Sequence, residues 1–249
     1  MAKITLHWLD KSRSHRILWL LEELKVDYDL KIYKRGSDML APPELKKVHA
    51  LGKSPVIEVQ ASEGDSPIII AESGAIVEYL SDHLGPQLIP KRYPEGKENQ
   101  LGAETKEWLR YRQLMHYAEG SLMGLLVIAL IMISIKNAPV PFFIKPLPRM
   151  VATRVEQQFL NRNFKTHFDF LEDQLATSGG DFFCGTDLSG ADILLIFPLE
   201  AARGRTGLDS EKYPKLCAYV DRIHERDAYK RAVKKIEDET GEPFSLALG

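Results

Sequence analysis

The chain has 249 residues, 44% of them hydrophobic, which is enough apolar material for one large core or two modest ones. Its 33 basic and 35 acidic residues give a formal net charge of −2 and form no long basic run, so nucleic acid is not an expected partner. The two cysteines, Cys184 and Cys217, are too few for a disulfide framework and have no partners at metal-ligand spacing. We therefore expect a reducing, cytoplasmic location and no metal site.

The N-terminal third alternates between strand and helix patterns. Apolar residues recur at helical spacing over 14–25, and apolar and polar residues alternate over 28–33. The predicted elements are, in chain order, a strand at 4–9, a helix at 14–25, a strand at 28–33, a short helix opening at 42, strands at 56–59 and 67–70 that form a hairpin, and a helix from 73 to about 83. We expect these elements to form one α/β domain over residues 1–85.

The rest of the chain shows no strand pattern. Residues 86–98 contain several prolines and mixed charge, and they are the expected linker to an all-helical domain at 99–249. Its predicted helices span 104–135, 153–176, 190–203, 213–225 and 228–239. Residues 240–249 would then form a frayed tail or a strap over a neighbouring surface.

One segment of the helical domain is uncharged. Residues 121–135 make about 15 residues, short of the ~20 needed to span a bilayer. A buried helix is therefore expected, and membrane association is the less favoured alternative. Four prolines follow, and we expect a loop to break the helix there, at Pro139, Pro141, Pro146 and Pro148.

Three short sequences in the first 80 residues carry the strongest signal in combination. They are Ser12–Arg16, Gly52–Val56 and Ala71–Ile76. Their order and spacing resemble the glutathione transferase family. The run Arg16–Leu24, with His116–Ser121, is similar to fungal and bacterial members, of a type with serine in the N-terminal motif. The resemblance implies an α/β thioredoxin-like N-terminal domain followed by an all-α helical-bundle C-terminal domain.

The resemblance also implies an activity. A cytoplasmic homodimer would conjugate the thiolate of glutathione to small hydrophobic electrophiles in detoxification, or would reduce organic peroxides. Glutathione would be a cosubstrate, with no bound cofactor. A glutathione-dependent disulfide reductase and a non-catalytic binding or dimerisation module are the alternatives.

Glutathione transfer needs a thiolate, and a thiol with an ordinary pKa of ~8.5 is mostly protonated at neutral pH. A hydroxyl hydrogen bond and a helix N-terminus both favour the thiolate. The family uses Tyr, Ser or Cys for this contact, and the chain has no Tyr before Tyr28 and no Cys before Cys184. Ser12 is therefore the expected catalytic residue and Ser14 the alternative, although a serine in this place is also a common helix cap.

Two further motifs are implied to bind glutathione. In the family the Ser54–Pro55 bond is cis, and Ser54 would pair with the peptide backbone of glutathione as an added strand does. Lys53 would meet the glycine carboxylate, with His49 and Arg35 as weaker candidates.

Glu72 and Ser73 follow a strand and begin a helix. Free amides at the helix start and the Ser73 hydroxyl can hold the γ-glutamyl carboxylate, and Glu72 can accept from the γ-glutamyl ammonium group. The alternative is that Ser73 only caps the helix.

The pocket for the second substrate is expected between the loop at Leu9 and the first long helix of the C-terminal domain. Tyr111, Met115 and Leu122 share one face of that helix and are candidates, although such a stripe can equally be core. Ser189 and Asp192 have the spacing of a capping box, a structural feature. In a dimer, Glu104 or Glu107 of the neighbouring chain could complete the ammonium site.

Overall fold

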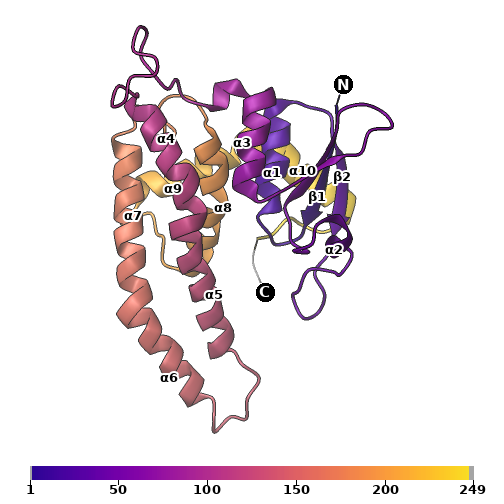
Figure 1. Cartoon of the computed structure of the whole chain (residues 1–249). Helices are drawn as coiled ribbons and strands as arrows, with labels where there is room; N and C mark the ends of the chain where they lie inside the picture. Colours follow the sequence, from indigo (N-terminus) through magenta and orange to yellow (C-terminus); the bar gives the residue numbers. More distant parts are fainter. Residues whose placement is uncertain (1, 247–249) are drawn as a thin grey trace.

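The computed structural model describes residues 2–246, apart from the side chain of residue 205. It consists of a small α/β domain beside a taller bundle of helices (Figure 1). The elements are β1 (Lys3–Leu9), α1 (Ser14–Leu24), β2 (Asp29–Tyr33), α2 (Leu45–Val48), β3 (Val56–Gln60), β4 (Ile68–Ala71), α3 (Ser73–Leu84), η1 (Pro86–Leu88), α4 (Lys106–Tyr117), η2 (Ala118–Met123), α5 (Gly124–Lys136), α6 (Pro146–Val155), η3 (Glu156–Leu160), α7 (Asn161–Ala176), α8 (Gly190–Arg205), α9 (Pro214–His224) and α10 (Asp227–Thr240).

The N-terminal domain has a mixed four-stranded sheet in the order β2-β1-β3-β4. β1 runs parallel to β2 and antiparallel to β3, and β3 and β4 form the predicted hairpin. Because β1 is central, six of its seven residues are buried, including the polar Thr5 and His7. The predicted order of strands and helices is confirmed, and so is the thioredoxin-like domain followed by helices.

Helices α1 and α3 join the two domains. Both pack against α8 of the bundle, and α1 also packs against α10. The apolar residues from Ile17 to Leu21 of α1 have no exposed surface because they are enclosed by the sheet on one side and by the bundle on the other. The ends of β1 and α3 therefore lie close to the junction between the domains. The predicted linker at 86–98 falls within the connection from α3 to α4, and its limits stay a prediction.

In the bundle, α4, η2 and α5 form one continuous helix, and α6, η3 and α7 form another (Figure 1). Both η2 and η3 are π-helical turns. A loop does break the helix after α5, as predicted, but the second helix begins at Pro146 instead of 153 and holds Pro146 and Pro148 in its first turn. Proline is tolerated there since the first amides of a helix have no acceptor within it.

The start of α8 is fixed by the predicted capping box. Asp192 has no exposed surface, and its carboxylate accepts from the Ser189 amide at 2.8 Å and the Ser189 hydroxyl at 2.7 Å. It also accepts from the Phe183 amide at 3.1 Å and the Tyr219 hydroxyl at 3.0 Å. Asp192 therefore ties α8 to α9 and to the preceding loop.

The C-terminal segment crosses back to the N-terminal domain, as a strap. Glu242 pairs with Lys34, with 2.7 Å between the carboxylate and the ammonium nitrogen, and the Phe244 amide donates to Glu237 at 3.0 Å. The Phe244 ring lies 4.0 Å from the ring of His15 on α1, centroid to centroid. The strap therefore covers the buried side of α1. Residues 247–249 of the predicted tail lie outside the described residues.

Candidate functional site

A cleft of about 450 Å³ lies between the N-terminal domain and α5. The N-terminal domain contributes four cations, Lys11, Arg13, Arg35 and Lys53, and no acidic residue among those described lines the cleft. The bundle contributes only apolar side chains, and these are Met123, Val127, Leu130 and Phe197. One wall of the cleft therefore suits an anionic ligand, and the other suits an apolar one.

Ser12 lines this cleft, and Ser14 lies behind it. Ser14 has no exposed surface, and its hydroxyl accepts from the Leu9 amide at 3.0 Å. The hydroxyls of Ser12 and Ser14 are 2.8 Å apart, and both lie within 2.9 Å of the Leu9 carbonyl oxygen. The Ser12 hydroxyl donates to that carbonyl, so its proton reaches a ligand in the cleft only if the hydroxyl rotates away and leaves the carbonyl to Ser14. Of the two serines, Ser12 borders the cleft and Ser14 is buried in the loop behind it.

Neither serine is the N-cap residue of α1, although the Ser12 hydroxyl accepts from the Ser14 amide, the first amide of the helix, at 3.2 Å. The N-cap residue is Arg13, and it makes no side-chain cap hydrogen bond. Ser12 instead lies two residues before the first helical turn, where free amides carry partial positive charge. A sulfur atom near Ser12 would meet both a hydroxyl donor and this helix end.

The loop before β3 forms one wall of the cleft. The Ser54–Pro55 peptide bond is cis, as the family resemblance implied, and the Ser54 hydroxyl donates to the His7 carbonyl of β1 at 2.7 Å. Lys53 and Ser54 line the cleft beside Arg35, whose Nε atom donates to the Asp10 carbonyl at 3.2 Å. His49 does not line the cleft, because it ends α2 and its Nδ1 accepts from the Leu51 amide at 3.4 Å. Of the three basic residues predicted to meet the glycine carboxylate, Lys53 and Arg35 line the cleft and His49 does not.

Glu72 adopts an unusual backbone conformation at the start of α3. Its φ is 70° and its ψ 119°, a region that residues with a side chain rarely occupy. Its side chain is exposed, and it caps the helix without a side-chain hydrogen bond. Strain of this kind is often retained where a side chain must point at a ligand.

The Ser73 hydroxyl accepts a hydrogen bond from a buried arginine. Arg16 of α1 is 1% exposed, and its guanidinium donates to the Ser73 hydroxyl oxygen at 2.5 Å and to the Leu194 carbonyl at 2.7 Å. It also pairs with Glu119 of η2, which in turn pairs with Arg13 at 3.3 Å. Because Ser73 accepts from Arg16, its own proton is free to donate to a carboxylate, and the guanidinium adds positive charge nearby.

The sequence analysis assigned no function to Arg16, although the residues around it indicate that its charge is buried. Arginine at position 16 precedes Ile17 and Leu18 within a helix whose first eight residues are all buried. Burial lowers the pKa of the Arg16 guanidinium from its ordinary value, and the Glu119 carboxylate opposes that effect. A charge inside an apolar helix run needs a partner, which is the signal that would have pointed to Glu119.

The predicted apolar pocket residues need a correction. Tyr111, Met115 and Leu122 are 2%, 5% and 0% exposed, belong to the core and do not line the cleft. Leu9 does line it, as predicted. The helix presents the next face to the cleft instead, through Met123 and its neighbours on α5.

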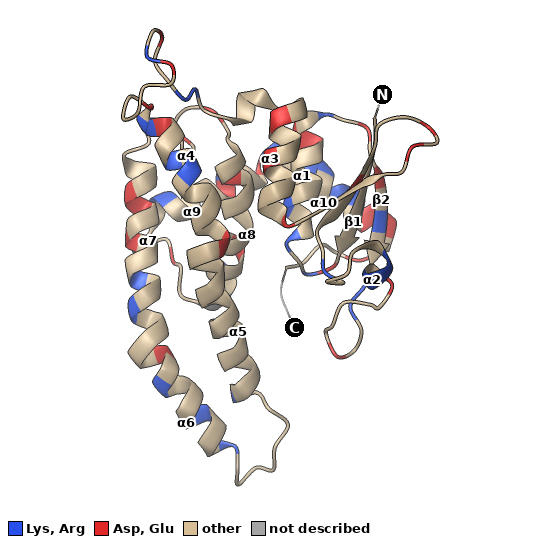
Figure 2. Ribbon diagram, viewed as in Figure 1, with Lys and Arg blue, Asp and Glu red and all other residues tan. Residues whose placement is uncertain are grey.

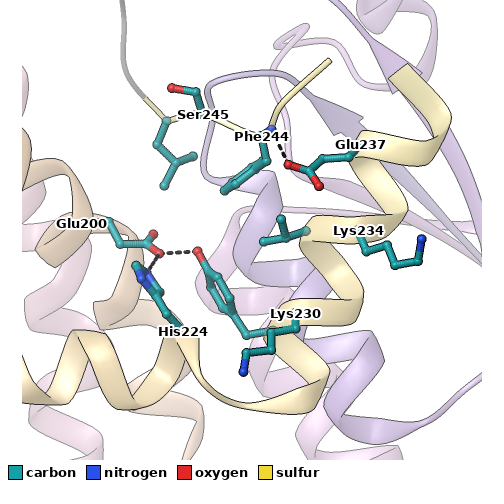
Figure 3. Close-up of a pocket in the computed structure, with 10 residues that line it drawn as sticks. Glu200, His224, Lys230, Lys234, Glu237, Phe244 and Ser245 are labelled. Carbon is teal, nitrogen blue, oxygen red and sulfur yellow. Dashed lines mark hydrogen bonds and ion pairs between the residues drawn. The ribbon is translucent and has the colours of Figure 1, made fainter. Parts of the chain in front are cut away.

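A second cavity, of about 460 Å³, lies between α9, α10 and the C-terminal strap (Figure 3). Glu200 accepts from His224 at 2.7 Å and from the Tyr229 hydroxyl at one end of it. Lys230 and Lys234 are on the α10 side, and the Phe244 ring faces in from the strap (Figure 3). Among the described residues, none predicted to bind glutathione lines this cavity, so the cleft at Ser12 is the candidate active site.

Both cysteines are buried and unbonded, on the bundle rather than at the cleft. Burial raises the pKa of the Cys184 thiol to about 12, so this thiol is not a nucleophile at neutral pH. Within residues 2–246, no group of three or more His, Cys, Asp or Glu side chains is arranged to hold a metal ion.

Comparisons with known proteins place the chain in a family. Residues 1–82 match the glutathione S-transferase N-terminal domain, and residues 140–235 match the glutathione S-transferase C-terminal domain. Glutathione S-transferase 1 of Saccharomyces cerevisiae is 37% identical over 232 residues, which are 93% of this chain and 94% of the yeast protein. The chain belongs to the glutathione S-transferase family.

Other members of the family are similar along nearly the whole chain. Glutathione S-transferase 3 of Schizosaccharomyces pombe is 31% identical over 97% of this chain and 91% of its own. A solved glutathione S-transferase from Actinobacillus pleuropneumoniae has a TM-score of 0.69 and 29% identity, covering 99% of this chain and 96% of that one. A homologue from Lodderomyces elongisporus, solved with two GSH per subunit, shares the fold with a TM-score of 0.67 and 18% identity, covering 92% and 97%. The predicted family is confirmed, and the chain is a glutathione S-transferase enzyme.

Proposed function

We propose that this enzyme conjugates glutathione to small hydrophobic electrophiles in the cleft at Ser12. The observation that carries the proposal is the division of the cleft into a cationic wall and an apolar wall. Glutathione has two carboxylates and one ammonium group, and it suits the cationic wall. An apolar electrophile suits Met123, Val127 and Leu130 on the opposite side.

The glutathione pose follows from the charges. The γ-glutamyl carboxylate meets Ser73 and the α3 amides, with the Arg16 guanidinium behind, and the ammonium group meets Glu72. The glycine carboxylate lies toward Lys53 and Arg35. The sulfur then lies near Ser12, between the two walls.

The reaction is a nucleophilic substitution or addition. The thiol loses its proton to solvent, and the thiolate forms a bond from sulfur to the electrophilic carbon as a leaving group departs or a double bond takes up the electron pair. Ser12 is a serine-type contact that donates to the thiolate and so favours it over the thiol. A disulfide reductase on this scaffold would have to use glutathione itself, because both protein thiols are buried away from the cleft.

We also propose a cytoplasmic homodimer built on α3 and α4. Glu104 is held by its own chain, since its carboxylate accepts from the Gly102 amide at 3.0 Å and lies 3.6 Å from Arg92. Glu107 is exposed on the first turn of α4, so it is the better candidate to reach the partner's ammonium site.

Ser12→Ala tests the catalytic assignment. The variant should raise the pKa of enzyme-bound glutathione, read from the thiolate absorbance and from the pH–rate profile of conjugation, while the dissociation constant for glutathione stays nearly unchanged. Ser12→Thr keeps the hydroxyl and is the matched control. An unchanged pH–rate profile in Ser12→Ala would show that Ser12 does not act on the thiolate. If the wild-type enzyme were not retained on a glutathione column, the proposed function itself would be wrong.

A further inference from the structure

The loop between α5 and α6 exposes an unusual amount of apolar surface. We call residues 140–151 the hairpin tip, and Figure 1 shows that it projects from the lower end of the bundle, away from the body of the protein. The exposed fractions of its apolar side chains are Phe142 82%, Phe143 69%, Met150 63%, Leu147 58%, Val151 49% and Ile144 40%. Single exposed apolar residues are common on protein surfaces, but a contiguous group of this kind marks an interaction surface.

The charges around the hairpin tip all have one sign. Between Glu119 and Glu156 the sequence has no acidic residue, and its four charged residues are Lys136, Lys145, Arg149 and Arg154. Lys136 pairs with Glu156. Within residues 2–246, the other three form no ion pair with a carboxylate. Figure 2 shows α5 without charge along most of its length and basic residues on the loop and α6 beyond it.

The packing of the bundle favours surface contact with a membrane through the hairpin tip over insertion of the long apolar helix. The continuous helix Lys106–Lys136 is long and apolar enough to cross a bilayer by length and composition, with mean hydropathy 2.2 in its most apolar window. However, α5 packs against both α6 and α8, and Leu126 is 1% exposed. Glu119 of η2, in the same continuous helix, pairs with the buried Arg16. Spanning would break these contacts, whereas contact through the tip leaves them intact.

A second copy of the chain is a poor partner for the tip. In a two-fold contact the same patch meets itself, so Lys145 and Arg149 of one copy would face the same cations of the other. An anionic bilayer surface complements both properties, because its head groups attract the cations and its acyl boundary accepts the aromatic rings.

We propose that the hairpin tip docks the enzyme reversibly on anionic membrane surfaces, with Phe142 and Phe143 in the acyl boundary and Lys145 and Arg149 at the head groups. α5 also provides Val127 and Leu130 to the cleft. Leu130 is six residues from the end of α5, which is roughly 9 Å along the helix axis. Docking therefore holds the apolar wall of the cleft close to the bilayer, whether or not the proposed reaction is the one performed there.

The test is co-flotation of the full chain with two kinds of vesicle, phosphatidylcholine alone and equal parts of phosphatidylcholine and phosphatidylserine. The wild type is expected to float mainly with the anionic vesicles. One basic residue near such a surface contributes roughly fivefold to partitioning, so Lys145→Gln with Arg149→Gln should lower it about 25-fold. Phe142→Ser with Phe143→Ser should lower it at least ~10-fold on the anionic vesicles.

The matched control variants make the same kinds of substitution outside the hairpin tip. Lys97→Gln with Lys215→Gln removes two exposed cations that form no ion pair with a carboxylate of the described residues, and Leu101→Ser removes an apolar side chain that is 95% exposed. Both should float as the wild type does, and circular dichroism and glutathione affinity should be unchanged in every variant. A wild type that stays in the soluble fraction, or tip variants that float as well as the controls, would overturn the proposal. A fall in oligomer mass by light scattering in the tip variants would assign the surface to a second copy instead.

Discussion

His15 should make the stability of the fold depend on pH, and a single substitution tests this. The residue is 2% exposed on α1, and its ring lies between Phe244 and Tyr229, with centroid distances of 4.0 and 5.3 Å. Neither ring nitrogen has a hydrogen-bond partner among the described residues. Burial lowers the pKa of His15 from 6.5 to about 3, and the charge of His224 contributes in the same direction.

The sign follows from proton binding. Between about pH 3 and 6.5 the unfolded chain holds a proton on His15 and the folded chain does not, so the free energy of unfolding falls as the pH is lowered through this window. The pKa of His15 is 6.5 in the unfolded chain and about 3 in the folded chain. Lowering the pH from about 7.5 to about 5 therefore lowers the free energy of unfolding by about 2 kcal/mol.

The assay is urea unfolding at both pH values and one protein concentration, since a dimer would make stability depend on concentration. His15→Leu should lose about 2 kcal/mol less than the wild type on acidification. At the higher pH it should be no less stable, because an apolar side chain replaces two unpaired buried nitrogens. His116→Leu, which removes an exposed histidine, should follow the wild type. Parallel pH dependence in the wild type and His15→Leu would refute the reasoning.

Three further results are expected. Glu72→Gln should weaken glutathione binding at least ~10-fold by calorimetry, because it removes a charged hydrogen bond worth ~1.5–3 kcal/mol, and wild-type affinity would contradict the pose. Asp192→Ala should lower the free energy of unfolding by at least ~3 kcal/mol, more than a lost cap alone, because four buried donors lose their acceptor; a loss under ~1 kcal/mol in urea would count against this. Light scattering should return twice the 28.2 kDa of one chain, and a monomer mass at micromolar concentration would exclude the dimer.

The features of the fold that the sequence predicted correctly are those determined by residues close together in the chain. The strand and helix order of the N-terminal domain follows from periodicity and turn residues, and the capping box at Ser189 and Asp192 follows from a three-residue spacing. The start of α6 was missed because Pro146 and Pro148 were read as breakers, although in the first turn of a helix they are compatible with it. Whether these prolines break a helix depends on their position in it. The apolar residues around them are too weakly periodic to show where the helix begins.

The cleft wall could not be predicted, because it depends on which face of one long helix meets a domain far away in sequence. Tyr111, Met115 and Leu122 do share a face, and that face is the core. Periodicity assumes 3.6 residues per turn, whereas η2 is a π-helical turn with a wider repeat, so the phase changes between α4 and α5. The same turn carries Glu119 to Arg16, 103 positions earlier in the chain. Arg16 is buried and Glu119 is partly exposed, and their pair joins α1, the Ser73 hydroxyl and the bundle, so this irregular turn builds the contact on which the proposed glutathione site rests.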